Sequence, residues 1–281
     1  TGAHRTPGVE LTPVTALGLV AALVGFELLD RLRGAIAAES GGRADDGPSA
    51  PPADVSPLAT DLREHVWKWV IPGLLLVIVA LEGNSLASIG WRVDSVERLI
   101  FQIGVGLAVM LGMNILFSPL WARVGDGGES LAAGLGTFAS LSVPERLFVA
   151  LTAGATEETA FHGYALERLL ALTGNVPLSG GIAFLAFTLG HTGDTWDRDA
   201  VARIAQPALV TTLLYLWFRS LPVLIAIHAL NDAVGLLLAD RFAAPEDGNG
   251  SAGGRDPGAS ERVEPGADGD DSDALGWLRG E

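Results

Sequence analysis

Polar side chains that could do chemistry interrupt three otherwise apolar stretches in the second half of this 281-residue sequence. They are Glu157, Glu158 and His162 in the first stretch, His191 at the end of the second, and His228, Asn231 and Asp232 in the third. Carboxylates and imidazoles are the usual acids, bases and zinc ligands of enzymes. Because a charged group at mid-bilayer costs about 2.5–3.5 kcal/mol on insertion scales, such residues within membrane-spanning helices mark a candidate functional site.

Helical spacing separates the roles of these residues. Neighbours on an α-helix differ by about 100° around the axis, so Glu157 and Glu158 cannot share one role. Glu158 and His162 are four residues apart and lie on one face, as do His228 and Asp232. We therefore expect Glu158 to pair with His162, which leaves Glu157 free for chemistry.

One carboxylate and two imidazoles that converge in a dry cavity suit two kinds of chemistry. In the first, the glutamate takes a proton from water, one histidine orients that water, and the other stabilises an oxyanion. In the second, the same three groups bind a catalytic zinc ion that keeps one position open for water. The sequence contains neither His-Glu-x-x-His nor Gly-x-Ser-x-Gly. It also has no cysteine, which excludes disulfides, thiolate metal sites and a cysteine nucleophile.

Charge and apolar residues occupy different parts of the chain. The sequence has 18 Lys and Arg against 33 Asp and Glu, a net charge of −15, yet 49% of its residues are hydrophobic and its mean hydropathy is +0.37. Long apolar runs joined by acidic segments are typical of a multi-span membrane protein rather than a soluble globule. The sequence offers no basic patch to neutralise phosphates, so we expect no nucleic acid partner.

The basic residues are almost all arginine, and Lys68 is the only lysine. Together with the acidic excess, this usage predicts a protein adapted to high salt, as in a halophilic archaeon. Codon bias in a GC-rich genome, which also replaces lysine by arginine, is the alternative explanation.

About seven hydrophobic helices are expected, which predicts an all-α fold, a polytopic transmembrane helix bundle. Their expected ranges are 14–29, 66–81, 99–117, 142–172, 177–189, 202–218 and 222–238. A capping box of Ser142 and Glu145 predicts the start of the fourth helix. Gly104, Ala108 and Gly112 recur at four-residue steps, and we expect this stripe of small residues to pack closely against a neighbouring helix.

The polar stretches resemble the three ordered motifs of the CPBP intramembrane proteases. The motifs are Glu157-Glu158-Thr-Ala-Phe-His162-Gly, Phe187-x-x-x-His191 and His228-x-x-x-Asp232. The family includes the type II CAAX prenyl endopeptidases and bacterial proteins that process bacteriocins or confer immunity to them. The resemblance covers residues 142–238, about a third of the chain, and it implies an endopeptidase that works within the membrane.

The resemblance also implies roles for individual residues. Glu157 would activate water together with His191, and Glu158 would be the supporting glutamate. His228 and Asp232 would line the oxyanion side of the site. The family is commonly described as metalloproteases, and a zinc ion, if one is used, would be held by Glu157, His191 and His228. A metal-free mechanism that depends on the glutamate is the alternative.

Two positions depart from the family pattern. His162 stands where the family usually has arginine, so its charge against Glu158 depends on protonation. At position 232, an ionised carboxylate cannot donate a hydrogen bond to an oxyanion as an amide would. Asp232 is then protonated, or the neighbouring Asn231 serves instead, or Asp232 orients His228; we favour the last because Asn231 lies about 100° off that face.

These features predict a multi-pass protein of the plasma membrane that hydrolyses a membrane-anchored or lipidated protein or peptide. The expected organisation is an N-terminal segment with a first span (1–38), a disordered linker (39–64), a transmembrane protease-like domain (65–242, with its motif core at 142–238) and a disordered acidic tail (243–281). A non-proteolytic immunity or scaffold protein of the same fold is the main alternative. A proton-coupled transporter ranks last, because the polar residues cluster on three helices instead of forming a path.

Overall fold

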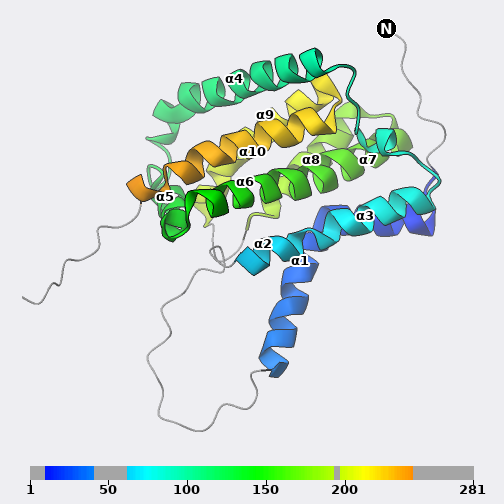
Figure 1. Ribbon diagram of the computed structural model, residues 1–281, viewed down its shortest axis with the longest axis horizontal. Coiled ribbons are helices and arrows are strands. Elements are labelled where there is room, and N and C mark those ends of the chain that lie inside the picture. The colour runs from blue at the N-terminus through cyan, green and yellow to red at the C-terminus, as the bar shows by residue number, and fades with distance from the viewer. Residues whose placement is uncertain (1–9, 41–61, 193–196, 243–281) are drawn as a thin grey trace, which may run out of the picture. The chain divides into compact units, whose positions relative to one another are not determined.

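The computed structural model of the protein describes residues 10–40, 62–192 and 197–242 (Figure 1). The chain divides into two compact units, residues 1–244 and residues 245–281. Most of the expected linker, residues 41–61, and the expected tail, residues 243–281, lie outside the described residues. All the helices described below therefore belong to the first unit.

The described residues fold into helices and contain no strand, which confirms the predicted all-α class. The longer helices are α1 (Pro13–Ser40), α2 (Leu62–Lys68), α3 (Val70–Leu81), α4 (Val96–Trp121), α5 (Glu129–Gly136), α6 (Val143–Glu158), α7 (Glu167–Thr173), α8 (Val176–Leu189), α9 (Arg198–Phe218) and α10 (Leu221–Leu237). The other helical segments are the π-helix η4 (Thr159–Leu166) and the short 3-10 helices η2 (Leu86–Ile89), η3 (Thr137–Ser140) and η5 (Ala239–Arg241).

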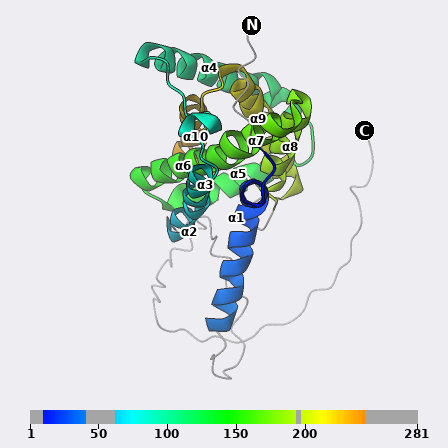
Figure 2. The ribbon, with the colours of Figure 1, turned by 90° about the vertical axis from the view of Figure 1, so that its right-hand side faces the viewer.

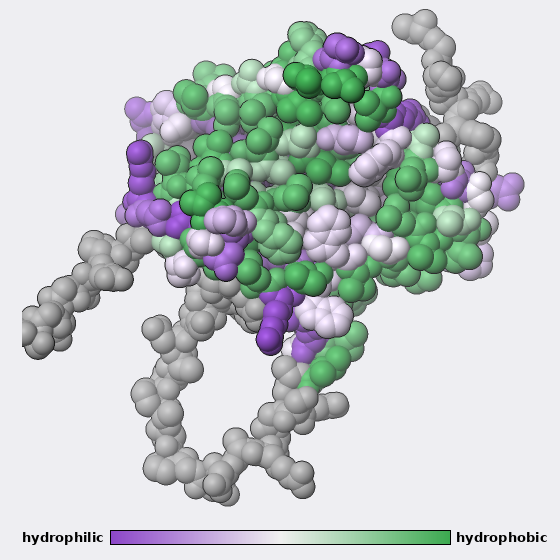
Figure 3. All heavy atoms as spheres, viewed as in Figure 1, coloured by the Kyte–Doolittle hydropathy of each residue, from purple (hydrophilic) through white to green (hydrophobic). Residues whose placement is uncertain are grey.

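Three of these helices, α1, α4 and α9, are long and apolar enough to cross a membrane. Residues 65–81, 176–189 and 221–237 form shorter apolar helices. Figure 3 shows hydrophobic residues spread over the middle of the viewed face, with hydrophilic residues gathered toward its ends. An apolar exterior of this kind fits a lipid environment. The predicted transmembrane character is thus supported, while the number of seven spans stays a prediction.

The helix that carries the first motif begins and ends as the sequence predicts. The backbone N–H of Ser142 donates to Glu145 Oε2 over 2.7 Å, which forms the capping box at the start of α6. The chain then remains helical through α6, η4 and α7. Gly174 ends it with a φ of 64°, a left-handed conformation that glycine adopts without steric cost.

Close packing of α6 against α10 brings two of the motifs together. A Cβ added at Gly154 would lie 2.9 Å from the backbone nitrogen of Ala229 and 3.0 Å from the carbonyl oxygen of Ile225. Only glycine therefore permits the two backbones to approach this closely. Glu158, one turn further along α6, consequently lies beside His228 of α10.

The predicted role of the small-residue stripe on α4 is wrong. Gly104, Ala108 and Gly112 are exposed, and added Cβ atoms at the two glycines would meet nothing within 4 Å. The close contact is made by Gly106, where an added Cβ would lie 2.1 Å from Ile227 Cδ1. Both ribbon views show α4 along one side of the helices, next to α9 and α10 (Figures 1 and 2). The four-residue spacing identified residues that share a face, but that face points away from the bundle.

Candidate active site

A cavity of about 810 Å³ lies among α2, α4, α6, α8, α9 and α10. Its walls are mostly apolar, and the candidate residues contribute much of its polar lining. The polar residues that line it include Lys68, Glu157, His191, His228, Asn231 and Asp232. The three sequence motifs, which are far apart along the chain, thus meet around a single space large enough for a peptide segment.

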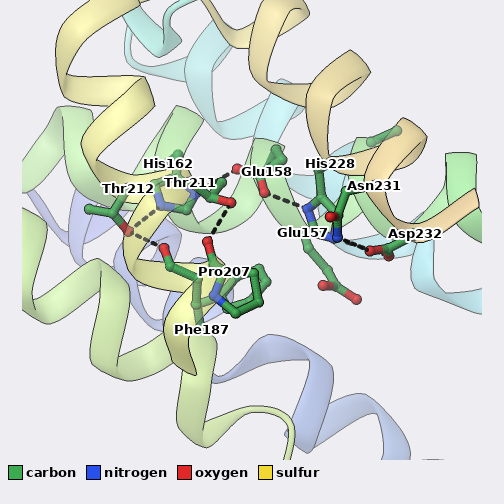
Figure 4. A network of polar contacts seen from close by, with 12 residues as sticks. Glu157, Glu158, His162, Phe187, Pro207, Thr211, Thr212, His228, Asn231 and Asp232 are labelled. Atoms are coloured by element: carbon green, nitrogen blue, oxygen red, sulfur yellow. Dashed lines mark hydrogen bonds and ion pairs between the residues drawn. The ribbon is translucent and has the colours of Figure 1, made fainter. Parts of the chain in front are cut away.

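Glu158 lies behind this cavity and binds two histidines. Its Oε1 is 2.5 Å from His228 Nδ1, and its Oε2 is 2.5 Å from His162 Nδ1. The first contact has hydrogen-bond geometry, whereas the second is an ion-pair distance without that alignment. Glu158 and His162 are completely buried (Figure 4). The predicted Glu158–His162 pair is therefore present, and the same carboxylate also holds the histidine of the third motif.

The chain after Glu158 is not a regular α-helix. Residues Thr159–Leu166 form the π-helical segment η4, a rare conformation that frequently occurs at functional sites. Within it, His162 Nε2 is 2.9 Å from the Thr212 hydroxyl, which itself donates to the carbonyl oxygen of Ala208 over 3.0 Å. Nε2 is consequently the donor, while Nδ1 faces the Glu158 carboxylate.

Glu157 points away from this buried group and toward the cavity (Figure 4). Its Oε1 accepts a hydrogen bond from Lys68 Nζ over 3.3 Å. Its Oε2 is buried, makes no hydrogen bond with the described residues and lies 3.7 Å from His191 Nε2. His191 Nδ1 is 2.8 Å from the Phe187 carbonyl oxygen, so Nδ1 carries a proton and donates it there, and Nε2 is the nitrogen directed toward Glu157.

His228 is held at both ring nitrogens. Nδ1 contacts Glu158, and Nε2 lies 3.2 Å from Asp232 Oδ2, one helical turn away on α10. This is the arrangement that an orienting role for Asp232 requires. The Asn231 amide nitrogen donates to the other oxygen of Asp232 over 3.3 Å. Both nitrogens of the imidazole thus face carboxylate oxygens, which fixes the orientation of the ring.

The aromatic ring of Phe187 is close to both histidines that line the cavity. Its centroid is 4.8 Å from that of His191 and 5.8 Å from that of His228. One apolar ring therefore accompanies the histidines of both halves of the site, Glu157 with His191 and Glu158 with His228.

Lys68 is a site residue that sequence reasoning did not identify. Two features of the sequence could have indicated it. It is the only lysine, and it lies between Trp67 and Trp69 at the start of an apolar run, where aromatic residues mark the membrane interface. Both tryptophans are about half exposed.

The side chains as placed do not form a zinc site. A tetrahedral catalytic site needs three protein donors directed at one point. His228 instead has both nitrogens directed at carboxylates, and within residues 10–40, 62–192 and 197–242 no group of three His, Cys, Asp or Glu side chains could hold a metal ion.

Residues 139–234 match the family model described as Type II CAAX prenyl endopeptidase Rce1-like. The matched segment runs from η3 into α10 and includes all seven polar residues of the three motifs. The chain matches no curated protein and no solved structure. The family match confirms, over residues 139–234, the resemblance that the motifs indicated.

Proposed function

We propose that the protein is an intramembrane endopeptidase that hydrolyses a peptide bond of a membrane-anchored or lipidated protein with water activated by Glu157 and His191. The observation that carries this proposal is the 3.7 Å separation between Glu157 Oε2 and His191 Nε2 in the cavity wall. The family match to residues 139–234 supports the same reaction class.

The two atoms are placed to bind one water molecule. Acceptors 3.7 Å apart can each receive a hydrogen bond of about 2.8 Å from the same water. As the water oxygen attacks the substrate carbonyl carbon, Glu157 takes one of its protons and the carbonyl oxygen becomes an oxyanion. When the tetrahedral intermediate collapses, the carbon–nitrogen bond breaks and that proton passes to the leaving amine. The products are a carboxyl terminus and a free amino terminus.

The other half of the site supplies a fixed imidazole. His228, oriented by Glu158 and Asp232, lines the same cavity as Glu157. A preorganised polar group stabilises a developing oxyanion because it does not have to reorganise during the reaction. The proposed reaction thus uses water and protein side chains alone.

The surroundings of the site favour a substrate at the membrane. The cavity walls are largely apolar, and exposed tryptophans flank Lys68 beside it. Tryptophans at that position are typical of the boundary between lipid and water. This placement supports the proposal of a multi-pass protein in the plasma membrane that acts on a lipid-attached substrate.

The test is cleavage by the full chain in lipid nanodiscs, measured with a fluorescence-quenched peptide that carries a lipid anchor. Glu157→Gln and His191→Ala should each abolish cleavage while both variants insert into the membrane and unfold at the temperature of the unaltered protein. If a variant that carries both changes retained full biological activity, the protease proposal would fail, and a scaffold or immunity role for the same fold would take its place.

A further inference from the structure

A line of side-chain amides runs along the cavity wall from α4 to the active site. The indole nitrogen of Trp121 donates to Gln206 over 3.1 Å, and the Gln206 amide donates to Asn114 over 3.0 Å. Asn114 donates in turn to Asn231 over 3.0 Å. Asn231 then donates to Asp232 over 3.3 Å, so four consecutive hydrogen bonds connect Trp121 to Asp232. We call these five residues the amide chain.

The two ends of the amide chain fix its direction. An indole N–H can only donate, and an ionised carboxylate can only accept. Each amide between them therefore presents its oxygen toward Trp121 and its nitrogen toward Asp232. Reversing a single amide would place two donors or two acceptors against each other, which is costly at half-buried positions in an apolar wall.

The direction of the amide chain explains the residue type at position 232. One oxygen of Asp232 accepts from Asn231, and the other lies 3.2 Å from His228 Nε2, within ion-pair distance. A carboxylate satisfies both donors. An amide at this position would accept one hydrogen bond and oppose the second donor with its own NH₂ group.

We propose that Asn114 and Gln206 are positioning residues, which act through Asn231 to hold Asp232 with both oxygens available and thereby fix His228 for the reaction. This inference rests on the proposed endopeptidase function. It gives α4, which contributes none of the motif residues, a direct connection to the oxyanion side of the site.

Reversal of the amide chain is the test. Gln206→Glu has the same shape but replaces the donor that faces Asn114 by an acceptor. The side-chain amides of Asn114 and Asn231 then rotate so that their oxygen and nitrogen atoms exchange places, which keeps the hydrogen bonds between them. Asn231 as a result presents its oxygen to the Asp232 carboxylate. We expect kcat to fall about tenfold, corresponding to about 1.4 kcal/mol, with KM little changed, because the displaced His228 acts in the transition state.

Asp232→Asn should then rescue the reversed chain. In the single variant Asp232→Asn, the new NH₂ group faces another N–H donor, so this change alone should also lower kcat about tenfold. Combined with Gln206→Glu, its NH₂ group donates to the turned Asn231 and its oxygen accepts from His228. We expect the double variant to recover to within about threefold of the unaltered protein, a coupling that independent structural defects would not produce.

Two further variants complete the design. Asn114→Asp reverses the chain one step nearer the site and should be rescued by the same Asp232→Asn change, so the test does not depend on the folding of one variant. Asn175→Asp is the matched control. The Asn175 side chain lies outside the amide chain and caps α8 by accepting a hydrogen bond from the Leu178 backbone N–H, a role that a carboxylate can also fill. It should leave kcat unchanged.

A second measurement separates this inference from the proposed function. The ¹⁵N and ¹H resonances of the His228 ring, read in the full chain labelled at histidine, should shift in Gln206→Glu and return in the double variant, whether or not cleavage occurs. If Glu157→Gln kept its activity, the protease proposal would fail while the His228 resonances still tested the amide chain. Unchanged His228 resonances in both reversed variants, or folded double variants no better than the single ones, would overturn the inference.

Discussion

Removal of the Lys68 charge tests how Glu157 is held. Lys68 Nζ binds Glu157 Oε1 over 3.3 Å, which leaves Oε2 directed at His191. Lys68→Met removes the ammonium and keeps a side chain of similar length. We expect the rate to fall because the Glu157 carboxylate is then free to rotate away from His191.

The magnitude follows from the geometry of the pair. Two unit charges 3.3 Å apart attract by about 5 kcal/mol at an effective dielectric constant of 20. The Lys68 side chain is 34% exposed, so solvent screens the pair and its net contribution falls to about 1 kcal/mol. A loss of that size lowers kcat/KM about fivefold. Loss of the Glu157 base itself should cost about 10²–10⁴-fold.

The assay is cleavage of the lipid-anchored peptide in nanodiscs, before and after acetylation of amines. Because Lys68 is the only lysine in the sequence, acetylation removes one side-chain charge, and it should reproduce the fivefold loss of Lys68→Met. Lys68→Arg should retain most of the activity and should not respond to the reagent. Full activity after complete acetylation would refute the positioning role, and a loss as large as that of Glu157→Gln would show that Lys68 takes part in the chemistry directly.

The remaining predictions concern packing, metal dependence and pH. Gly154→Ala should destabilise the protein by about 1–3 kcal/mol, since its Cβ would lie 2.9 Å from the Ala229 nitrogen; thermal unfolding in detergent measures this, and Gly181→Ala, with nothing within 4 Å, is the control. A chelator such as EDTA should leave peptide cleavage unchanged, and restoration of a chelated enzyme by zinc would contradict the metal-free proposal. Hydrogen bonds from Arg146 to both oxygens of Asp240 lower the pKa of that carboxyl, so the stability it adds is present above its unfolded pKa of about 3.9 and is lost as pH falls through the lower folded value. The acid side of the unfolding curve should therefore flatten in Asp240→Asn, and an identical curve would exclude the pair as a source of stability.

The sequence predicted the features that depend on local patterns. Apolar runs predicted the helices, and the capping box at Ser142 predicted where α6 begins. Four-residue spacing predicted the Glu158–His162 pair, even though the intervening chain is π-helical. These predictions succeed because helix formation and same-face contacts involve residues that are close together in the chain.

The features that the sequence did not predict depend on contacts between distant residues. Lys68 and Glu157 are separated by 89 positions, and Asn114 and Asn231 by 117. Periodicity identifies residues that share a face, but it does not say which face meets another helix, so the stripe at Gly104 was assigned to the wrong side of α4. The choice between these faces is made by tertiary packing, here by the contact between Gly106 and Ile227.

Phe187 has a consequence for how the two imidazoles of the cavity can communicate. Its ring is close to both His191 and His228 and has no group that can donate or accept a proton. A proton therefore cannot pass between the two imidazoles through this side chain, and any exchange between them must run through water in the cavity.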